Sequence, residues 1–148
     1  MGVVRLSALP PLTHVYVDVE NVTDITPDSL LPILESQNGR LSQKTAFLSN
    51  KNRRMGDSWQ DAGFKLWIGD DGPDAADRGM VTQILNDAFG QHTSAGHDTA
   101  KIVIVGGDRM YRGLAYLCCK AGYDVEFIVR RTPSAALEKT GAKITHID

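Results

Sequence analysis

Acidic residues stand at several places in this chain where strands are expected to end, and a catalytic or metal-binding site could form there. They are Asp18 and Glu20, Asp108 after the apolar run 101–105, and Asp74 with Asp77 at the start of a helix. The polar Asn21 adjoins the first of these groups. Each acid taken alone has an ordinary explanation, as a helix cap or as a side-chain turn after a strand. Together they favour a shared site, because converging carboxylates without cationic partners repel one another unless a cation lies between them.

The chemistry that fits such a cluster is hydrolysis at a phosphate. Hard oxygen ligands with room for water suit Mg²⁺ or Mn²⁺. Such an ion lowers the pKa of a bound water and neutralises charge on a phosphate in the transition state. Asp77 is expected to face the sheet, because the apolar stripe of its helix follows at helical spacing. The stripe consists of Met80, Val81, Ile84, Leu85 and Ala88. The alternative is that these two acids have only a structural role, in which Asp74 and Asp77 form a capping-box-like pair at the start of the helix.

The elements that must position these acids alternate along the chain. Strands are expected at 14–19, 45–49, 64–68, 101–105, 123–129 and 143–147, and helices at 27–37, 74–89, 110–121 and 133–139. Such alternation implies right-handed βαβ units, hence a three-layer α/β/α sandwich with a mostly parallel sheet of five to six strands. The run 101–105 is the most continuous apolar strand and should be central, beside the strand that ends at Asp18. That arrangement would bring Asp18 and Asp108 together.

Composition limits the possible classes of protein. The 148 residues suit one domain over 1–148, and the net charge of −2 excludes a general nucleic-acid coat. A nucleic-acid site must therefore be a local patch. The adjacent Cys118 and Cys119 are typical of a reducing compartment. The first 14 residues contain no long apolar run, so we expect a cytoplasmic chain without a membrane span.

Three motifs together resemble the NYN domains of the PIN-like nuclease superfamily. They read VYVDVENV at 15–22, GPDAAD at 72–77 and IVIVGGD at 102–108, with Leu114 and GYDVE at 122–126 in support. The similarity covers roughly residues 13–132, the expected domain core. It implies an α/β/α fold and a metal-dependent endoribonuclease. By position, Asp18 matches the first metal-binding aspartate, Asn21 the orienting asparagine and Asp108 the aspartate after the central strand. The middle acid matches Asp74 in one family pattern and Asp77 in a related one, and its inward face favours Asp77. We therefore expect Asp18, Asn21, Asp77 and Asp108 to be catalytic, and Asp74 and Glu20 to be further candidate metal ligands.

The chain departs from the family pattern at one acidic position. Many NYN proteins read SGDxDF where this chain reads GGDRMY at 106–111, so Met110 replaces a second aspartate. The loss keeps an alternative open: a catalytically degenerate module that binds RNA or a protein partner. The resemblance also leaves room for a homodimer.

Basic residues near the same edge favour a polyanionic partner, which we expect to be single-stranded RNA. The expected phosphate contacts are Lys51, Arg53, Arg54, Arg109 and Arg112. Two further basic residues near this edge, Arg130 and Arg131, follow the fifth strand. Trp59 and Trp67 could stack on bases, although core packing is favoured for both.

Other classes of α/β protein find less support in the sequence. A response-regulator-like phosphoacceptor domain would use acids such as Asp70 and Asp71 after the third strand, but the lysine it needs after the fifth strand is missing. No phosphate-binding P-loop, dinucleotide-binding glycine turn or nucleophile elbow is present.

Overall fold

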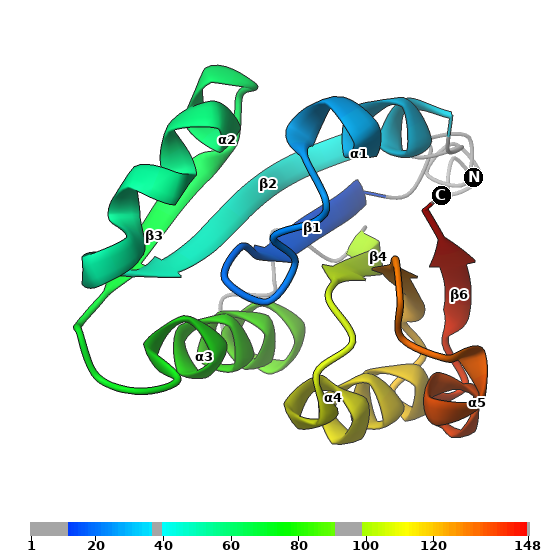
Figure 1. Cartoon of the computed structure of the whole chain (residues 1–148). Coiled ribbons are helices and arrows are strands. Elements are labelled where there is room, and N and C mark those ends of the chain that lie inside the picture. Colours follow the sequence, from blue (N-terminus) through cyan, green and yellow to red (C-terminus); the bar gives the residue numbers. More distant parts are fainter. Residues whose placement is uncertain (1–11, 37–39, 91–98, 148) are drawn as a thin grey trace, which may run out of the picture.

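The computed structural model describes residues 12–36, 40–90 and 99–147 (Figure 1). The strands are β1 (Leu12–Asp18), β2 (Arg40–Ser49), β3 (Lys65–Gly69), β4 (Thr99–Val105), β5 (Asp124–Val129) and β6 (Lys143–His146). The helices are α1 (Pro27–Glu35), α2 (Asp57–Asp61), α3 (Ala75–Phe89), α4 (Arg109–Lys120) and α5 (Ser134–Leu137). Two 3₁₀ helices, η2 (Asn50–Gly56) and η4 (Glu138–Thr140), complete the described elements.

The six strands form one parallel sheet in the order β3-β2-β1-β4-β5-β6, which confirms the predicted fold class. β4 lies inside the sheet between β1 and β5, as predicted. The strand order reverses between β1 and β4, and ligands of doubly wound folds bind at the carboxyl ends of such a pair. The order also excludes the phosphoacceptor alternative, whose fold places its third strand, not its fourth, beside the first.

Helices cover both faces of the sheet, with α1 and α2 on one side and α3, α4 and α5 on the other (Figure 1). Because successive side chains of a strand point to opposite faces, β1 contributes to both cores. Val15 and Val17 pack with Leu30 of α1, whereas Tyr16 packs with Met80 of α3. Asp18 has the same parity as Tyr16, so it faces the α3 side.

The first helix follows its predicted start closely. The hydroxyl of Thr26 accepts a hydrogen bond from the Ser29 amide at 3.2 Å, and Ser29 Oγ accepts one from the Thr26 amide at 3.1 Å. Pro27 occupies the first helical position, where a missing amide hydrogen costs nothing. α1 ends at Glu35. Gly39, the glycine expected to stop this helix, lies outside the described residues.

In α3 the structural alternative for the acids does not form, and one residue of the predicted apolar stripe is exposed. Asp74 has the left-handed φ of +60° and its side chain caps no amide, so the capping pair with Asp77 does not form. Leu85 is 40% exposed, because Ile84 faces the sheet and the next residue lies about 100° further round the helix. The polar Gly, Ser and His residues at 90–99 also predict a loop, most of which lies outside the described residues.

The predicted core packing of Trp59 is confirmed. Trp59 is buried edge-to-face against Phe64, with ring centroids 5.0 Å apart. Within the described ranges, every helix is too short or too polar to cross a bilayer.

Candidate active site

Two aspartates from distant parts of the chain meet at the carboxyl end of β1. Asp18 is the last residue of β1 and is fully buried, and Asp77 lies in the first turn of α3 with 6% of its surface exposed. The apolar residues on either side fix both positions: Val17 and Val19 hold the strand end, and Met80 holds the helix against the sheet. The predicted inward orientation of Asp77 is confirmed.

Asn21 joins the two carboxylates. Its Nδ2 donates to Asp18 Oδ2 at 2.6 Å and to Asp77 Oδ1 at 3.0 Å. The turn that carries it is closed by a hydrogen bond from the Asn21 amide to the Asp18 carbonyl, 3.2 Å long. The side chain therefore holds both carboxylates by hydrogen bonds, while the catalytic role expected of Asn21 stays a prediction.

Tyr111 of α4 is a second donor that the sequence interpretation missed. Its hydroxyl lies 2.6 Å from Asp18 Oδ2 and 3.2 Å from Asp77 Oδ1, and its ring is fully buried. Burial and the charges of Asp18 and Asp77 raise the pKa of the Tyr111 phenol, so the hydroxyl keeps its hydrogen. Tyr111 stands where the family pattern has phenylalanine, and that difference was the available signal.

Ionising both members of the Asp18–Asp77 pair, here called the acid pair, is electrostatically unfavourable. Burial, followed by hydrogen bonding and charge from Asp18, raises the pKa of Asp77 to about 7. The Tyr111 hydroxyl acts in the opposite direction, and the charge of Asp108 adds a smaller increase. At neutral pH, Asp77 therefore exchanges a proton readily, and a positive charge beside the pair would favour its ionised form.

The pair also has unused capacity to bind a ligand. Asp18 Oδ1 is buried and has no hydrogen-bond partner in the structure. None of the ion pairs among the described residues includes Asp18 or Asp77. A buried carboxylate oxygen without a partner is costly. The site therefore fits a small divalent cation, for which carboxylate oxygens are the preferred ligands.

Asp108 lies on the adjacent strand end but is engaged as a helix cap. Its Oδ1 accepts a hydrogen bond from the Met110 amide at 2.8 Å, at the first turn of α4. Met110 is 41% exposed. Within the described part of the chain, no three acidic, histidine or cysteine side chains form a group that could hold a metal ion. A ligand role for Asp108 thus stays a prediction.

Glu20 is bound by another loop. Its Oε2 accepts hydrogen bonds from the Ser49 amide at 2.7 Å, from the Ser49 hydroxyl and from Asn52 Nδ2 at 2.8 Å. Burial alone would raise the pKa of Glu20, but these hydrogen bonds outweigh it and lower the pKa. Glu20 therefore anchors η2, the segment that carries Lys51, Arg53 and Arg54.

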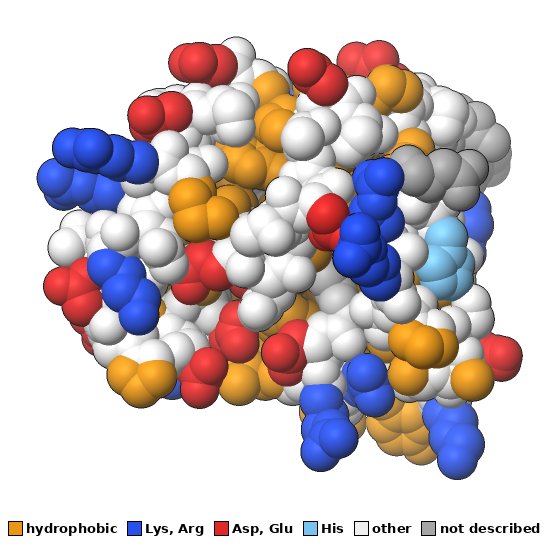
Figure 2. All heavy atoms as spheres, viewed as in Figure 1, with side chains coloured by type: hydrophobic (Ala, Val, Ile, Leu, Met, Phe, Trp, Pro, Cys, Tyr) orange, Lys and Arg blue, Asp and Glu red, His pale blue; other side chains and the backbone are white. Residues whose placement is uncertain are grey.

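Both acidic and basic side chains lie on the face of the molecule that Figure 2 shows. In Figure 2, several Asp and Glu side chains lie over the lower centre of the face, between Lys and Arg groups at the left, right and bottom. Of the predicted phosphate contacts, Lys51, Arg53, Arg54 and Arg109 are exposed. Arg112 is half-buried, and its Nη2 donates to the Gly107 carbonyl at 3.3 Å. The four exposed residues are thus accessible to a ligand.

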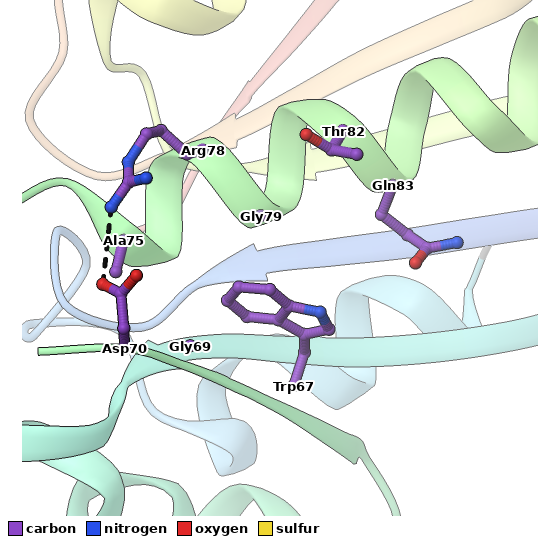
Figure 3. Close-up of a pocket in the computed structure, with 8 residues that line it drawn as sticks. All are labelled: Trp67, Gly69, Asp70, Ala75, Arg78, Gly79, Thr82 and Gln83. Carbon is purple, nitrogen blue, oxygen red and sulfur yellow. Dashed lines mark hydrogen bonds and ion pairs between the residues drawn. The ribbon is translucent and has the colours of Figure 1, made fainter. Parts of the chain in front are cut away.

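A hollow of about 350 Å³ lies on the other flank of α3, over the edge strand β3 (Figure 3). Its wall is the half-buried ring of Trp67, which packs against the backbone of Gly69 and Gly79. A Cβ atom at Gly79 would lie 2.3 Å from the indole ring. Arg78 on its rim pairs with Asp70 at 3.4 Å, so its charge is compensated. The Trp67 ring thus lines this hollow, and neither Asp18 nor Asp77 does.

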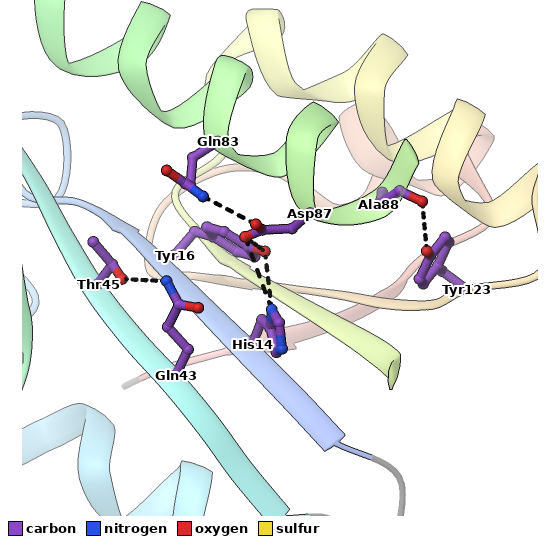
Figure 4. A network of polar contacts seen from close by, with 8 residues as sticks. All are labelled: His14, Tyr16, Gln43, Thr45, Gln83, Asp87, Ala88 and Tyr123. Atoms are coloured by element: carbon purple, nitrogen blue, oxygen red, sulfur yellow. Dashed lines mark hydrogen bonds and ion pairs between the residues drawn. The ribbon is translucent and has the colours of Figure 1, made fainter. Parts of the chain in front are cut away.

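A second polar network occupies the same face of β1 nearer its start (Figure 4). The Tyr16 hydroxyl donates to Asp87 Oδ2 at 2.7 Å, Gln83 donates to Asp87 Oδ1 at 2.9 Å, and His14 lies 3.8 Å from Asp87. Burial would raise the pKa of Asp87, but the hydrogen bonds from these partners outweigh it and lower the pKa. Because its acid is fully partnered, the network acts as a structural tie between β1 and α3.

The fold and the paired aspartates are those of a nuclease-like α/β/α domain. The family model of the NYN domain matches residues 13–148. The chain therefore belongs to the NYN domain family of the PIN-like nuclease superfamily, and the match extends beyond the predicted core to β6. Membership indicates a nuclease-like, RNA-related function. No curated protein matches the chain significantly.

Proposed function

We propose that this chain is a divalent-metal-dependent endoribonuclease that hydrolyses RNA phosphodiester bonds with water as the nucleophile. The observation that carries the proposal is the buried Asp18–Asp77 pair, which has an unpartnered oxygen and takes part in none of the ion pairs among the described residues. Its position at the strand-order reversal is where a doubly wound fold binds its ligand. Family membership supports a nucleic acid as the substrate.

Some residues of the site would bind the metal ion, and others orient the carboxylates that bind it. Asp18 and Asp77 would hold Mg²⁺ or Mn²⁺, with Asp108 as the third acid of the site. When bound, such an ion supplies an activated water and neutralises phosphate charge. Asn21 and Tyr111 orient the pair by donating to one oxygen of each carboxylate, which leaves Asp18 Oδ1 free for a ligand.

The exposed cations of the chain would bind the substrate backbone. Lys51, Arg53 and Arg54 of η2 and Arg109 of α4 lie on connections that follow strand ends, and Glu20 anchors the η2 segment. Binding should weaken as salt rises, because each phosphate contact releases counterions from the RNA.

Cleavage of a circular single-stranded RNA tests the proposal, since a circle has no ends for an exonuclease. We expect linear products with Mn²⁺ and none with EDTA. Asp18→Asn should abolish cleavage, whereas Asp71→Asn, an exposed charge change in the β3–α3 loop, should leave it intact. A mock purification controls for contaminating nuclease. Equal cleavage by wild type and Asp18→Asn would contradict the proposal.

The second candidate function is a module that binds RNA without cutting it. Two observations favour it: Met110 occupies the position of a family acid, and the described residues provide no ready group of three ligands. In that case RNA would stay intact under every metal tested while still binding to the protein.

A further inference from the structure

A second hollow lies directly beside the acid pair. It measures about 270 Å³ and is formed by the loops that follow β1, β4 and β5, at residues 21–25, 106–107 and 129–132. Asn21, which donates to both Asp18 and Asp77, also lines this hollow. A ligand there would therefore adjoin a group bound at the acid pair.

Two of the residues that line this hollow are glycines, Gly106 and Gly107. Gly106 has a φ of +139°, which other residues rarely adopt. A Cβ atom at Gly107 would lie 2.4 Å from Thr132 Oγ1, so the β4–α4 and β5–α5 connections are in direct contact. The hollow is thus bounded by closely packed loops.

The charge of the lining is positive. Arg130 and Arg131 face a single carboxylate, that of Asp24, among the lining residues. Arg130 Nη1 donates to the Asp24 carbonyl at 3.1 Å, so the guanidinium is held in place without an ion pair. Arg131 Nε lies 3.3 Å from Asp24 Oδ2, and the arginine side chain is 84% exposed. Each guanidinium has five N–H donors, and these contacts leave most of them available.

Stability alone does not account for this arrangement. An ion pair with so exposed an arginine contributes about 0–1 kcal/mol. Two forked guanidinium groups beside a polar hollow are, in contrast, the standard means of binding phosphate oxygens.

We propose that this hollow is a phosphate-binding subsite. It would take the backbone phosphate of a single-stranded RNA one or a few nucleotides from the bond at the acid pair. Arg130 and Arg131 bind the phosphate oxygens, and Asp24 limits their affinity by pairing with Arg131. The RNA strand then runs along the carboxyl edge of the sheet. It passes from η2, over the acid pair, to the β5–α5 connection. This inference rests on the proposed function, because it assumes that RNA is the ligand of the acid pair.

The test measures binding of a short fluorescent 2′-O-methyl RNA in EDTA by anisotropy, so that neither cleavage nor metal affects the result. We expect Arg131→Ala to weaken binding about 3- to 10-fold and to flatten the dependence of log K on log salt by about 0.7, the value for one phosphate contact on a single strand. Asp24→Asn should tighten binding, because it removes the carboxylate that competes for Arg131 and keeps the backbone carbonyl that Arg130 uses.

The matched controls lie at the amino ends of β5 and β6, whereas the proposed subsite lies at the carboxyl ends of the strands. Lys143→Ala at the start of β6 and Asp124→Asn at the start of β5 make the same charge changes and should leave binding unchanged. Binding that weakens equally in Arg131→Ala and Lys143→Ala, or a failure of Asp24→Asn to tighten it, would overturn the subsite. A wild-type chain that binds no RNA would overturn the proposed function as well.

Discussion

Replacing Asp77 by asparagine should stabilise the metal-free protein at alkaline pH. Its pKa is 3.8 ordinarily and about 7 in the folded chain, and at about 1.4 kcal/mol per pKa unit this difference amounts to roughly 4 kcal/mol. Between these pH values the folded state holds a proton that the unfolded state has released, so rising pH favours unfolding. The penalty is absent below pH 3.8 and complete above about pH 7. Asparagine at position 77 keeps an oxygen that can accept from Asn21 and Tyr111, so the substitution removes chiefly the charge.

Urea unfolding in EDTA at pH 5 and at pH 8 measures this effect. We expect Asp77→Asn to exceed the wild type by a few kcal/mol at pH 8 and by clearly less at pH 5. The comparison between proteins cancels the contributions of titrating groups that do not interact with Asp77. Asp71→Asn provides the exposed control and should change the free energy of unfolding by less than about 0.5 kcal/mol. A variant that is less stable than wild type at pH 8, or whose advantage does not depend on pH, would refute the reasoning.

Three further substitutions test separate parts of the structure. Tyr111→Phe removes a hydrogen bond to the Asp18 carboxylate and should lower the free energy of unfolding at pH 8 by about 2 kcal/mol, measured in urea; an unchanged value would show that the hydroxyl contributes nothing. Gly79→Ala improves helix propensity by about 1 kcal/mol, yet it should destabilise the chain on balance, because the new methyl group would meet the Trp67 ring; a stabilised variant would contradict this packing. Met110→Asp should raise Mn²⁺ affinity measured by calorimetry, since it restores the acid of the family pattern, and an unchanged affinity would show that position 110 faces away from the ion.

The predictable part of the site follows from strand and helix periodicity. Asp18 ends an apolar run, and β-strand alternation together with parallel pairing puts it at the carboxyl edge beside β4. Asp77 shares a helix face with Met80 and Ile84, so its inward orientation follows from their spacing. These rules depend on local pattern alone, and for that reason the acid pair could be found without a structure.

Contacts between loops and between distant side chains could not be found in the same way. The Tyr111 hydroxyl meets Asp18 across 93 residues, and a tyrosine in an apolar helix ordinarily indicates only core packing. Glu20 lies in a turn, where alternation no longer fixes orientation, so its hydrogen bonds to Ser49 were not predictable. Arg130 reaches the Asp24 carbonyl across 106 residues, a contact set by the packing of two loops.

The proposed chemistry depends on a divalent cation bound by the Asp18–Asp77 pair. Titration of the protein with Mn²⁺, followed by the loss of the free-ion electron paramagnetic resonance signal, measures this binding directly. We predict weak but saturable uptake by the wild type and by Asp71→Asn, and loss of that uptake in Asp18→Asn. Equal uptake by wild type and Asp18→Asn, or none by the wild type, would contradict a cation site at the acid pair.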